Sequence, residues 1–154
     1  MSCITKLAVV ALTLLAPLGP AASTQAAERV PFTITDQVDF VSGVITFTAT
    51  GPLCPSGTFV DDTRVIAGHP DSSGRIKLLN RTVYTCDDGS GTFNTLRQVF
   101  ITLGPDGSFT STGPVQLLGG TGAFSDLTGY GVDNATGNFA TGVVGEISGF
   151  VVQR

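Results

Sequence analysis

From residue 30 onward, hydrophobic and polar residues alternate along the chain. Phe32 and Ile34, for example, alternate with Thr33 and Thr35. Such alternation, in segments rich in valine, threonine, isoleucine and phenylalanine, is typical of β-strands that are buried on one face. No segment of ten or more residues has the period of an amphipathic helix, although one helical turn is expected around residues 123–127. The pattern therefore predicts an all-β fold.

Turn residues divide this pattern into eight strands. Clusters of glycine or proline with aspartate, asparagine or serine favour tight turns, and they lie at residues 42–43, 52–57, 70–74, 87–91, 104–107 and 134–138. The strands expected between them span residues 32–41, 44–50, 58–68, 75–86, 92–103, 108–118, 129–134 and 142–152. Sequential strands joined by short turns predict an antiparallel up-and-down barrel, because closure leaves no unpaired edge strand. A two-sheet sandwich is the alternative architecture.

Residues 1–26 differ from this pattern. A positively charged start precedes an uncharged apolar run over residues 7–18, and small residues follow. This order is typical of a secretory signal peptide, so we expect cleavage after Ala26, loss of Cys3 and a secreted domain over residues 27–154. An uncleaved membrane anchor is the alternative, but the run is shorter than the ~20 residues needed to span a bilayer.

Two cysteines, Cys54 and Cys86, remain in the expected domain. In a chain bound for an oxidising compartment, such a pair is expected to form a disulfide. The turn at residues 70–74 supports this pairing, because a hairpin there would bring the two cysteines opposite each other. Metal binding is the alternative, but the cysteine spacing is wide and the only histidine, His69, is near neither cysteine in sequence. We therefore expect no metal and no cofactor.

Charge narrows the partners that the domain can bind. Charged residues make up 13% of the chain, the formal net charge is −4, and the eight lysines and arginines form no cluster. Nucleic-acid binding and adhesion to anionic lipid both depend on clustered basic residues, so neither partner is expected. No second apolar run is long enough to span a membrane, so we expect no membrane partner after cleavage.

Residues 117–131 combine five glycines with two aromatics. Glycine is favoured where backbone turns sharply or lies against other backbone. The glycines expected to be structural are Gly119, Gly120, Gly122 and Gly129. We expect residues 119–131 to cross from the sixth strand to the seventh, with Phe124 and Leu127 turned inward as a plug because their spacing puts them on one face of a helical turn.

The same segment carries a family resemblance. Residues 118–124, LGGTGAF, followed by residues 127–131, LTGYG, resemble the glycine signature of the allene oxide cyclase and dirigent barrel superfamily. The segments CPSGT at residues 54–58 and TCDDGSGTF at residues 85–93 look like the paired-cysteine segments of its small secreted bacterial members. The resemblance covers roughly residues 44–152 and implies an eight-stranded antiparallel barrel with a central cavity. It also implies a homo-oligomer, since the plant enzymes are often trimeric.

The two activities of this family are cyclisation of an unstable allene oxide and stereochemical guidance of phenoxy-radical coupling. Both use an apolar barrel cavity that contains a few polar groups. Outside the glycine signature, this chain has no motif that matches the family's catalytic residues, so the resemblance identifies no catalytic residue here. A fold alone does not determine an activity.

Candidate polar residues for the cavity come from the third, fourth and fifth strands. Asp62 and Arg64 share one face of the third strand, and Arg97 lies on the fifth. A charge inside a barrel is costly unless it is paired, so an interior Asp–Arg pair would be a structural pin or an anchor for a ligand. The alternative places these charges on the outer face. Asp61 and Asp62 are neighbours on a strand, so they point to opposite faces.

The remaining motifs do not indicate catalysis. Asp87 and Asp88 fit a tight turn, and no Gly-x-Ser-x-Gly elbow occurs. Asn80 and Asn134 begin N-glycosylation sequons, which matter only in a eukaryotic secretory route. The sequence predicts a secreted barrel that binds a small apolar ligand or has an extracellular structural role. The alternatives are a cyclase, isomerase or coupling guide acting in the cavity, and a surface or matrix component acting through the outer face.

Overall fold

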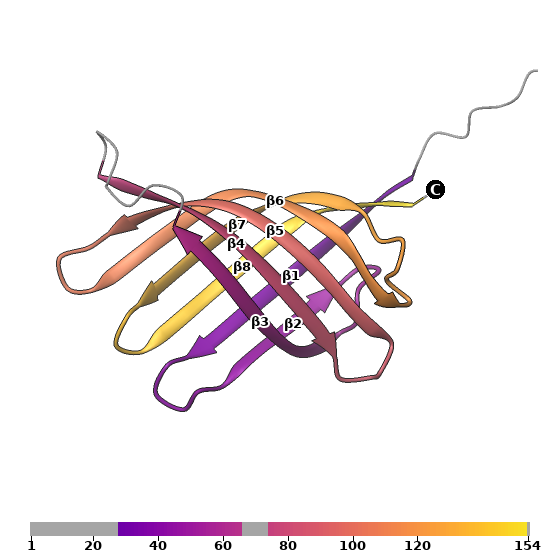
Figure 1. Ribbon diagram of the computed structural model, residues 1–154, viewed down its shortest axis with the longest axis horizontal. Coiled ribbons are helices and arrows are strands. Elements are labelled where there is room, and N and C mark those ends of the chain that lie inside the picture. The colour runs from indigo at the N-terminus through magenta and orange to yellow at the C-terminus, as the bar shows by residue number, and fades with distance from the viewer. Residues whose placement is uncertain (1–27, 66–73, 154) are drawn as a thin grey trace, which may run out of the picture.

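The computed structural model describes residues 28–65 and 74–153, which form one closed antiparallel barrel (Figure 1). The strands are β1 (Glu28–Asp39), β2 (Ile45–Thr50), β3 (Ser56–Val65), β4 (Arg75–Cys86), β5 (Gly91–Leu103), β6 (Ser108–Gly122), β7 (Gly129–Asn138) and β8 (Gly142–Gln153). Each strand pairs with its neighbours in sequence, and β1 pairs with β8 to close the barrel. The predicted up-and-down barrel is confirmed, and the sandwich is excluded.

Some of the expected features lie outside the described residues. These are the signal peptide with Cys3, the histidine His69, and most of the turn at residues 70–74. Within residues 28–65 and 74–153, no helix is long and apolar enough to cross a membrane.

Alternation along the strands separates a buried interior from the outer surface. On β1, Phe32, Ile34 and Asp36 are buried, whereas Thr35 and Gln37 are exposed. Because successive side chains of a strand point to opposite faces, the period of two seen in the sequence decides which residues enter the barrel. The interior receives apolar side chains at most positions and a few charged ones.

Packed aromatic rings fill one half of the barrel. This aromatic plug consists of Phe47, Phe59, Tyr84, Phe93 and Phe124. The rings of Tyr84 and Phe93 stack with their centroids 4.6 Å apart, and Phe47 meets both edge-on, at 5.0 Å from Tyr84 and 5.7 Å from Phe93. Phe124 packs against Phe93 with a centroid distance of 5.6 Å. Pairs of this kind add to the stability that burial of the rings already provides.

The predicted Cys54–Cys86 disulfide is confirmed, with the two Cα atoms 6.0 Å apart. Cys54 lies in the β2–β3 connection and Cys86 ends β4, and both belong to the same buried cluster as the aromatic plug. The β4–β5 and β6–β7 connections lie at this end of the barrel, which is also the end where β8 finishes (Figure 1). A covalent bond and a packed core therefore close the same end.

The glycine-rich segment is part strand and part turn, so the expectation that all of it crosses between strands is wrong. Residues 119–122 continue β6 alongside β5, and only residues 123–128 make the crossing. Phe124 is buried and Leu127 is partly buried against the core. Both side chains therefore face inward, as the sequence predicts.

Two glycines in this segment are required for different reasons. Gly122 has a φ of 60°, which residues with a side chain rarely adopt. Gly120 has no positive φ, but a Cβ at this position would lie only 1.8 Å from the carbonyl oxygen of Thr92. The close approach occurs at an irregularity in the β5–β6 register between Thr92 and Asn94, where Asn94 Nδ2 donates to the Gly119 carbonyl at 2.6 Å. Gly120 therefore accommodates a β-bulge.

The turn expected at residues 134–138 is wrong, because these residues belong to β7. They pair with β6 from Ser108 to Thr112, and the chain reverses only after Asn138. The side chain of Asn138 accepts a hydrogen bond from the Ala140 backbone N–H at 2.8 Å and donates to the carbonyl of Asp106 at 3.2 Å. Asn138 thus stabilises a turn, but that turn follows a β7 that is longer than the sequence predicts.

Candidate functional site

The half of the barrel opposite the aromatic plug contains a cavity of about 450 Å³. All eight strands contribute to its wall. Most of the wall is apolar, with side chains that include Val38, Phe59, Leu78, Val99, Ile101 and Phe109. Ile45 and Val143, at the starts of β2 and β8, line the cavity, so it reaches the end of the barrel where the β1–β2, β5–β6 and β7–β8 connections lie (Figure 1). Phe40 from the β1–β2 connection lines the cavity and is also 49% exposed.

A buried cluster of charged residues borders this cavity. Arg97 of β5 is 6% exposed, and its Nη2 lies 2.7 Å from Oδ2 of Asp36 on β1. The same carboxylate oxygen accepts a hydrogen bond from the hydroxyl of Tyr84 at 3.0 Å, and Arg97 also donates to that hydroxyl. Asp133 of β7 lies on the other side, with Oδ1 3.9 Å from Nη1 of Arg97. Strands that are distant in sequence thus converge on one guanidinium.

Burial changes the protonation behaviour of this cluster. Desolvation raises the pKa of Asp36 above its ordinary value, although Arg97 opposes the shift. Desolvation likewise raises the pKa of Asp133 to about 6, again against the attraction of Arg97. Burial by itself would lower the pKa of Arg97, but the Tyr84 oxygen and the two carboxylates raise it. The guanidinium therefore stays charged at neutral pH, while Asp133 exchanges a proton near pH 6.

Three buried acceptor oxygens in this region have no hydrogen-bond partner. They are Oδ1 of Asp36, Oδ1 of Asp133 and Oδ1 of Asn80. The three residues all line the cavity. Buried polar atoms in folded proteins nearly always have a partner, so an unpartnered group requires an explanation. Here all of the unpartnered atoms are acceptors, which is the property that a bound hydrogen-bond donor would complement.

Small residues lie beside two of these acceptors. Gly145 of β8 is buried and lies opposite Asp36 on β1 and Ala135 on β7. A Cβ built on Gly145 would lie 3.7 Å from Oδ1 of Asp133 and 3.8 Å from the Cβ of Asp36. A methyl group at Gly145 would therefore be in van der Waals contact with both residues, so Gly145 lies directly beside the two carboxylates.

The structure places the three predicted cavity residues differently. Arg97 lines the cavity, whereas the side chain of Arg64 lies outside the part of the chain that the structure describes. The expectation for Asp62 is wrong: both Asp61 and Asp62 are exposed, but only Asp61 lines the cavity. Buried Phe59 sets the phase of β3, so residues 59 and 61 share the inner face.

Asp36, Asp133 and Tyr84 were not among the predicted site residues. Asp36 carried a usable signal, because it occupies the inward phase of a strand between Ile34 and Val38. Asp133 carried a weaker signal. The residues two positions before and after it, which share its face of the strand, are the small residues Gly131 and Ala135. A charged residue in the apolar phase of a strand indicates an interior partner or a site.

The two sequons also differ in placement. Asn80 lines the cavity, where an attached glycan would not fit. Asn134 is exposed on β7, and its Oδ1 accepts a hydrogen bond from the Thr112 hydroxyl at 2.8 Å. Of the two sequons, only the one at Asn134 is on the outer surface.

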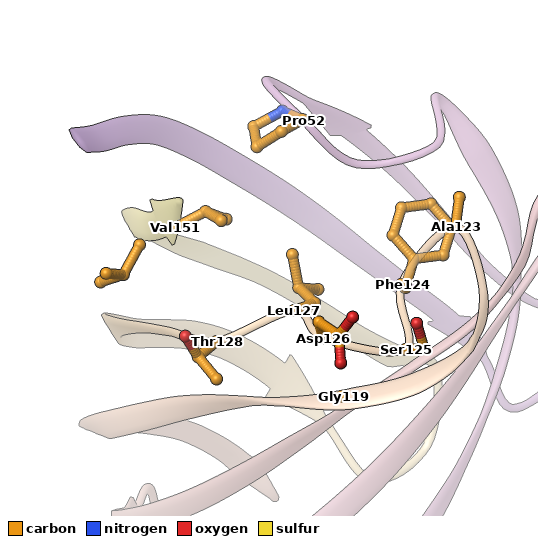
Figure 2. A pocket seen from close by; sticks show the side chains of 10 residues that line it. Pro52, Gly119, Ala123, Phe124, Ser125, Asp126, Leu127, Thr128 and Val151 are labelled. Atoms are coloured by element: carbon orange, nitrogen blue, oxygen red, sulfur yellow. The ribbon is translucent and has the colours of Figure 1, made fainter. Parts of the chain in front are cut away.

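A second hollow, of about 820 Å³, lies outside the closed end of the barrel. Its labelled side chains come from the connection after β2, the β6–β7 turn and the end of β8, and Leu127 lies between Phe124 and Val151 in this view (Figure 2). Asp126 is the only titratable side chain that lines it. This hollow is larger than the interior cavity, but it has no buried charged group.

The described residues contain no group of three or more histidine, cysteine, aspartate or glutamate side chains arranged to hold a metal ion. No family model matches the chain, and neither the curated proteins nor the solved structures provide a match. Function is therefore inferred from the cavity and the residues that line it.

Proposed function

We propose that this protein is a secreted barrel that binds a small apolar ligand in its interior cavity. The observation that carries the proposal is the cluster of Asp36, Arg97 and Asp133 beside a mostly apolar wall. Ligand sites in proteins typically combine an apolar lining with a few polar groups that orient the ligand. The volume of about 450 Å³ is within the range of small-molecule sites.

A purely structural role explains this cluster less well. A buried ion pair contributes little to stability unless hydrogen bonds satisfy its remaining oxygens. Here Asp36 and Asp133 each keep one oxygen without a hydrogen-bond partner. Such oxygens make the cluster costly as a purely structural pin, so the arrangement favours a site.

Export of the domain is part of the proposal. The disulfide between Cys54 and Cys86 is typical of proteins that fold in an oxidising compartment. The charged start, apolar run and small residues before Ala27 are the sequence features that support a cleaved leader. Sequencing the N-terminus of secreted material tests this part, and retention of the apolar run would contradict it.

A second candidate function is that of an isomerase, cyclase or coupling guide that works in the same cavity. The specific observation in its favour is Asp133, whose pKa of about 6 suits proton transfer near neutral pH. The resemblance to the allene oxide cyclase and dirigent barrels supports the same class. Incubation with reactive precursors of these types, and loss of turnover on Asp133→Asn, would favour this candidate over simple binding.

Binding is tested with a neutral fluorescent probe such as Nile red and two matched substitutions. Ala135→Leu places a larger side chain in the cavity wall, whereas Ala123→Leu places the same change at an exposed position beyond the aromatic plug. We expect the wild-type protein and Ala123→Leu to bind the probe and Ala135→Leu to bind it much more weakly. Circular dichroism checks that the variants are folded, and Ser111→Leu fills another part of the same wall. Equal binding by all of them would overturn the proposal.

A further inference from the structure

The charges that line the cavity do not cancel. Among the described lining residues, three carboxyl groups belong to Asp36, Asp61 and Asp133, and one cation belongs to Arg97. When all four groups are ionised, the lining carries an excess of two negative charges; Asp61 is at an exposed position, whereas Asp36 and Asp133 are buried. An apolar wall weakens the screening of these charges. A cavity with this balance favours a cation and repels an anion.

The hydrogen-bonding groups of the cavity also favour a cation that carries N–H donors. Arg97 already donates to Asp36, to the hydroxyl of Tyr84 and, at 3.4 Å, to Oγ1 of Thr95. Asp36 and Asp133 are both more than nine-tenths buried, and each has one unpartnered oxygen. The buried side-chain atoms without a hydrogen-bond partner beside this cavity are therefore acceptors, which a ligand with N–H donors would complement.

We infer that the cavity binds an amphiphilic amine, with its alkyl or aryl part against the apolar wall and its ammonium group between Asp36 and Asp133. This inference rests on the proposed function, and it names the chemical class of the ligand. An ammonium group has three N–H donors and no acceptor. These match the unpartnered oxygens of Asp36, Asp133 and Asn80. Gly145, which has no side chain, lies beside the same two carboxylates.

Other polar groups fit this environment less well. A fatty carboxylate would face the excess negative charge, and the one lining guanidinium is already paired with Asp36 at 2.7 Å. An alcohol supplies one donor, and its own lone pairs would face carboxylate oxygens. The order of affinity expected for equal tails is therefore amine, then alcohol, then carboxylate.

The test uses octylamine, octanol and octanoate, which share one tail length and differ in the head group. Displacement of bound Nile red and calorimetric titration at pH 7.5 measure their affinities for the mature domain. We expect octylamine to bind about tenfold or more tightly than octanol, a difference of about 1.4 kcal/mol, and octanoate to bind most weakly. Binding of octylamine should saturate at one molecule per chain.

Two matched substitutions test whether the cavity carboxylates cause the preference for octylamine over octanol. Asp133→Asn removes a carboxylate from the cavity, whereas Asp126→Asn removes one from the surface beyond the aromatic plug. The preference for octylamine over octanol should fall several-fold in Asp133→Asn and remain unchanged in Asp126→Asn. Asp61→Asn provides a second cavity variant that does not touch the Asp36–Arg97 pair.

The outcomes separate this inference from the proposed function. If octanol or octanoate binds as tightly as octylamine while Nile red still binds, the ligand class is wrong and the binding function stands. If neither Nile red nor any member of the series binds, both are wrong. If the preference for octylamine is the same in wild type, Asp133→Asn and Asp61→Asn, the cavity carboxylates do not cause it, and the inference is overturned.

Discussion

The hydroxyl of Tyr84 donates a hydrogen bond to Oδ2 of Asp36 at 3.0 Å, although 48 residues separate the two in sequence. The ring of Tyr84 belongs to the aromatic plug, while Asp36 lines the cavity. This one contact therefore joins the packed half of the barrel to the hollow half. The predictions below test the elements that meet there and the closed end behind them.

Replacement of Tyr84 by phenylalanine tests the junction directly. The ring stays packed, but Asp36 and Arg97 each lose a hydrogen-bond partner. We expect the free energy of unfolding to fall by about 1–2 kcal/mol. Tyr130→Phe is the matched control, because that side chain is 62% exposed and its loss of a hydroxyl should change stability by less than about 0.5 kcal/mol. Urea titration measures both, and equal effects would contradict the prediction.

Arg97→Met should be far more damaging at neutral pH. It removes the cation that compensates the buried carboxylates of Asp36 and Asp133, so we expect a loss of about 3–5 kcal/mol in the free energy of unfolding. Arg81→Met on the exposed face of β4 is the control and should have little effect. Adding Asp36→Asn to Arg97→Met should restore part of the loss. No restoration would argue against an electrostatic cause.

Asp133→Asn should stabilise the protein above pH 6. The pKa of Asp133 is about 6 in the folded state against an ordinary value of 3.8, so the folded state holds a proton that the unfolded state releases. The contribution of Asp133 to the free energy of unfolding is therefore fully present below about pH 4 and is lost as the pH rises through 6. The charged and titratable groups that face it are Arg97 on β5, Asp36 on β1 and Asp61 on β3.

The expected gain for Asp133→Asn is about 1–3 kcal/mol at pH 8, and it should vanish near pH 4. Chemical denaturation of both proteins at several pH values measures the difference. Asp126→Asn, which removes a carboxylate from the exposed β6–β7 turn, should show no such pH dependence. A gain that is constant across the pH range would mean that ionisation is not its source.

Gly120→Ala and Gly89→Ala separate close packing from backbone conformation. Gly89 has a φ of 74° and open space around its Cβ position, so alanine there should cost about 1 kcal/mol through strain alone. Gly120 has no positive φ, but its Cβ would strike the Thr92 carbonyl. We expect a cost of about 1–3 kcal/mol that is larger than the cost at Gly89, because backbone must move. Thermal unfolding ranks the two variants, and the reverse order would contradict the bulge assignment.

The disulfide should stabilise the closed end. Replacing both Cys54 and Cys86 by alanine should lower the free energy of unfolding by about 2–5 kcal/mol. A reducing agent should lower the stability of the wild type and leave the double variant unchanged. Thiol labelling of the unfolded, unreduced mature domain should detect no free cysteine, and labelling of both would show that the bond does not form in solution.

Much of the fold follows from local pattern, because burial on one face forces a period of two and turn residues mark where strands reverse. The predictions fail where a residue has a structural role other than the most common one for its type. Asn138 has turn propensity but ends a strand, and Gly120 lies within a strand because another backbone is close. Such approaches depend on neighbouring strands, which a local pattern does not contain.

The site was predictable only in part, for the same reason. Arg97 was identified as a charge on a strand near other charges, but its partner Asp36 is on β1, 61 residues away. The choice between Asp61 and Asp62 depends on a phase that Phe59 sets, and this signal was present in the sequence. The cavity itself depends on how side chains from eight strands fit together, so no single segment reveals it.

The aromatic plug has a kinetic consequence for the cavity beside it. Because packed rings and the Cys54–Cys86 bond close one end, a guest enters and leaves on the side of the cavity away from the aromatic plug. Changes at the rim, for example at Phe40, would then slow or speed entry and departure together while leaving the equilibrium nearly constant. Residence time and affinity could therefore change independently, the first through the rim and the second through the buried carboxylates.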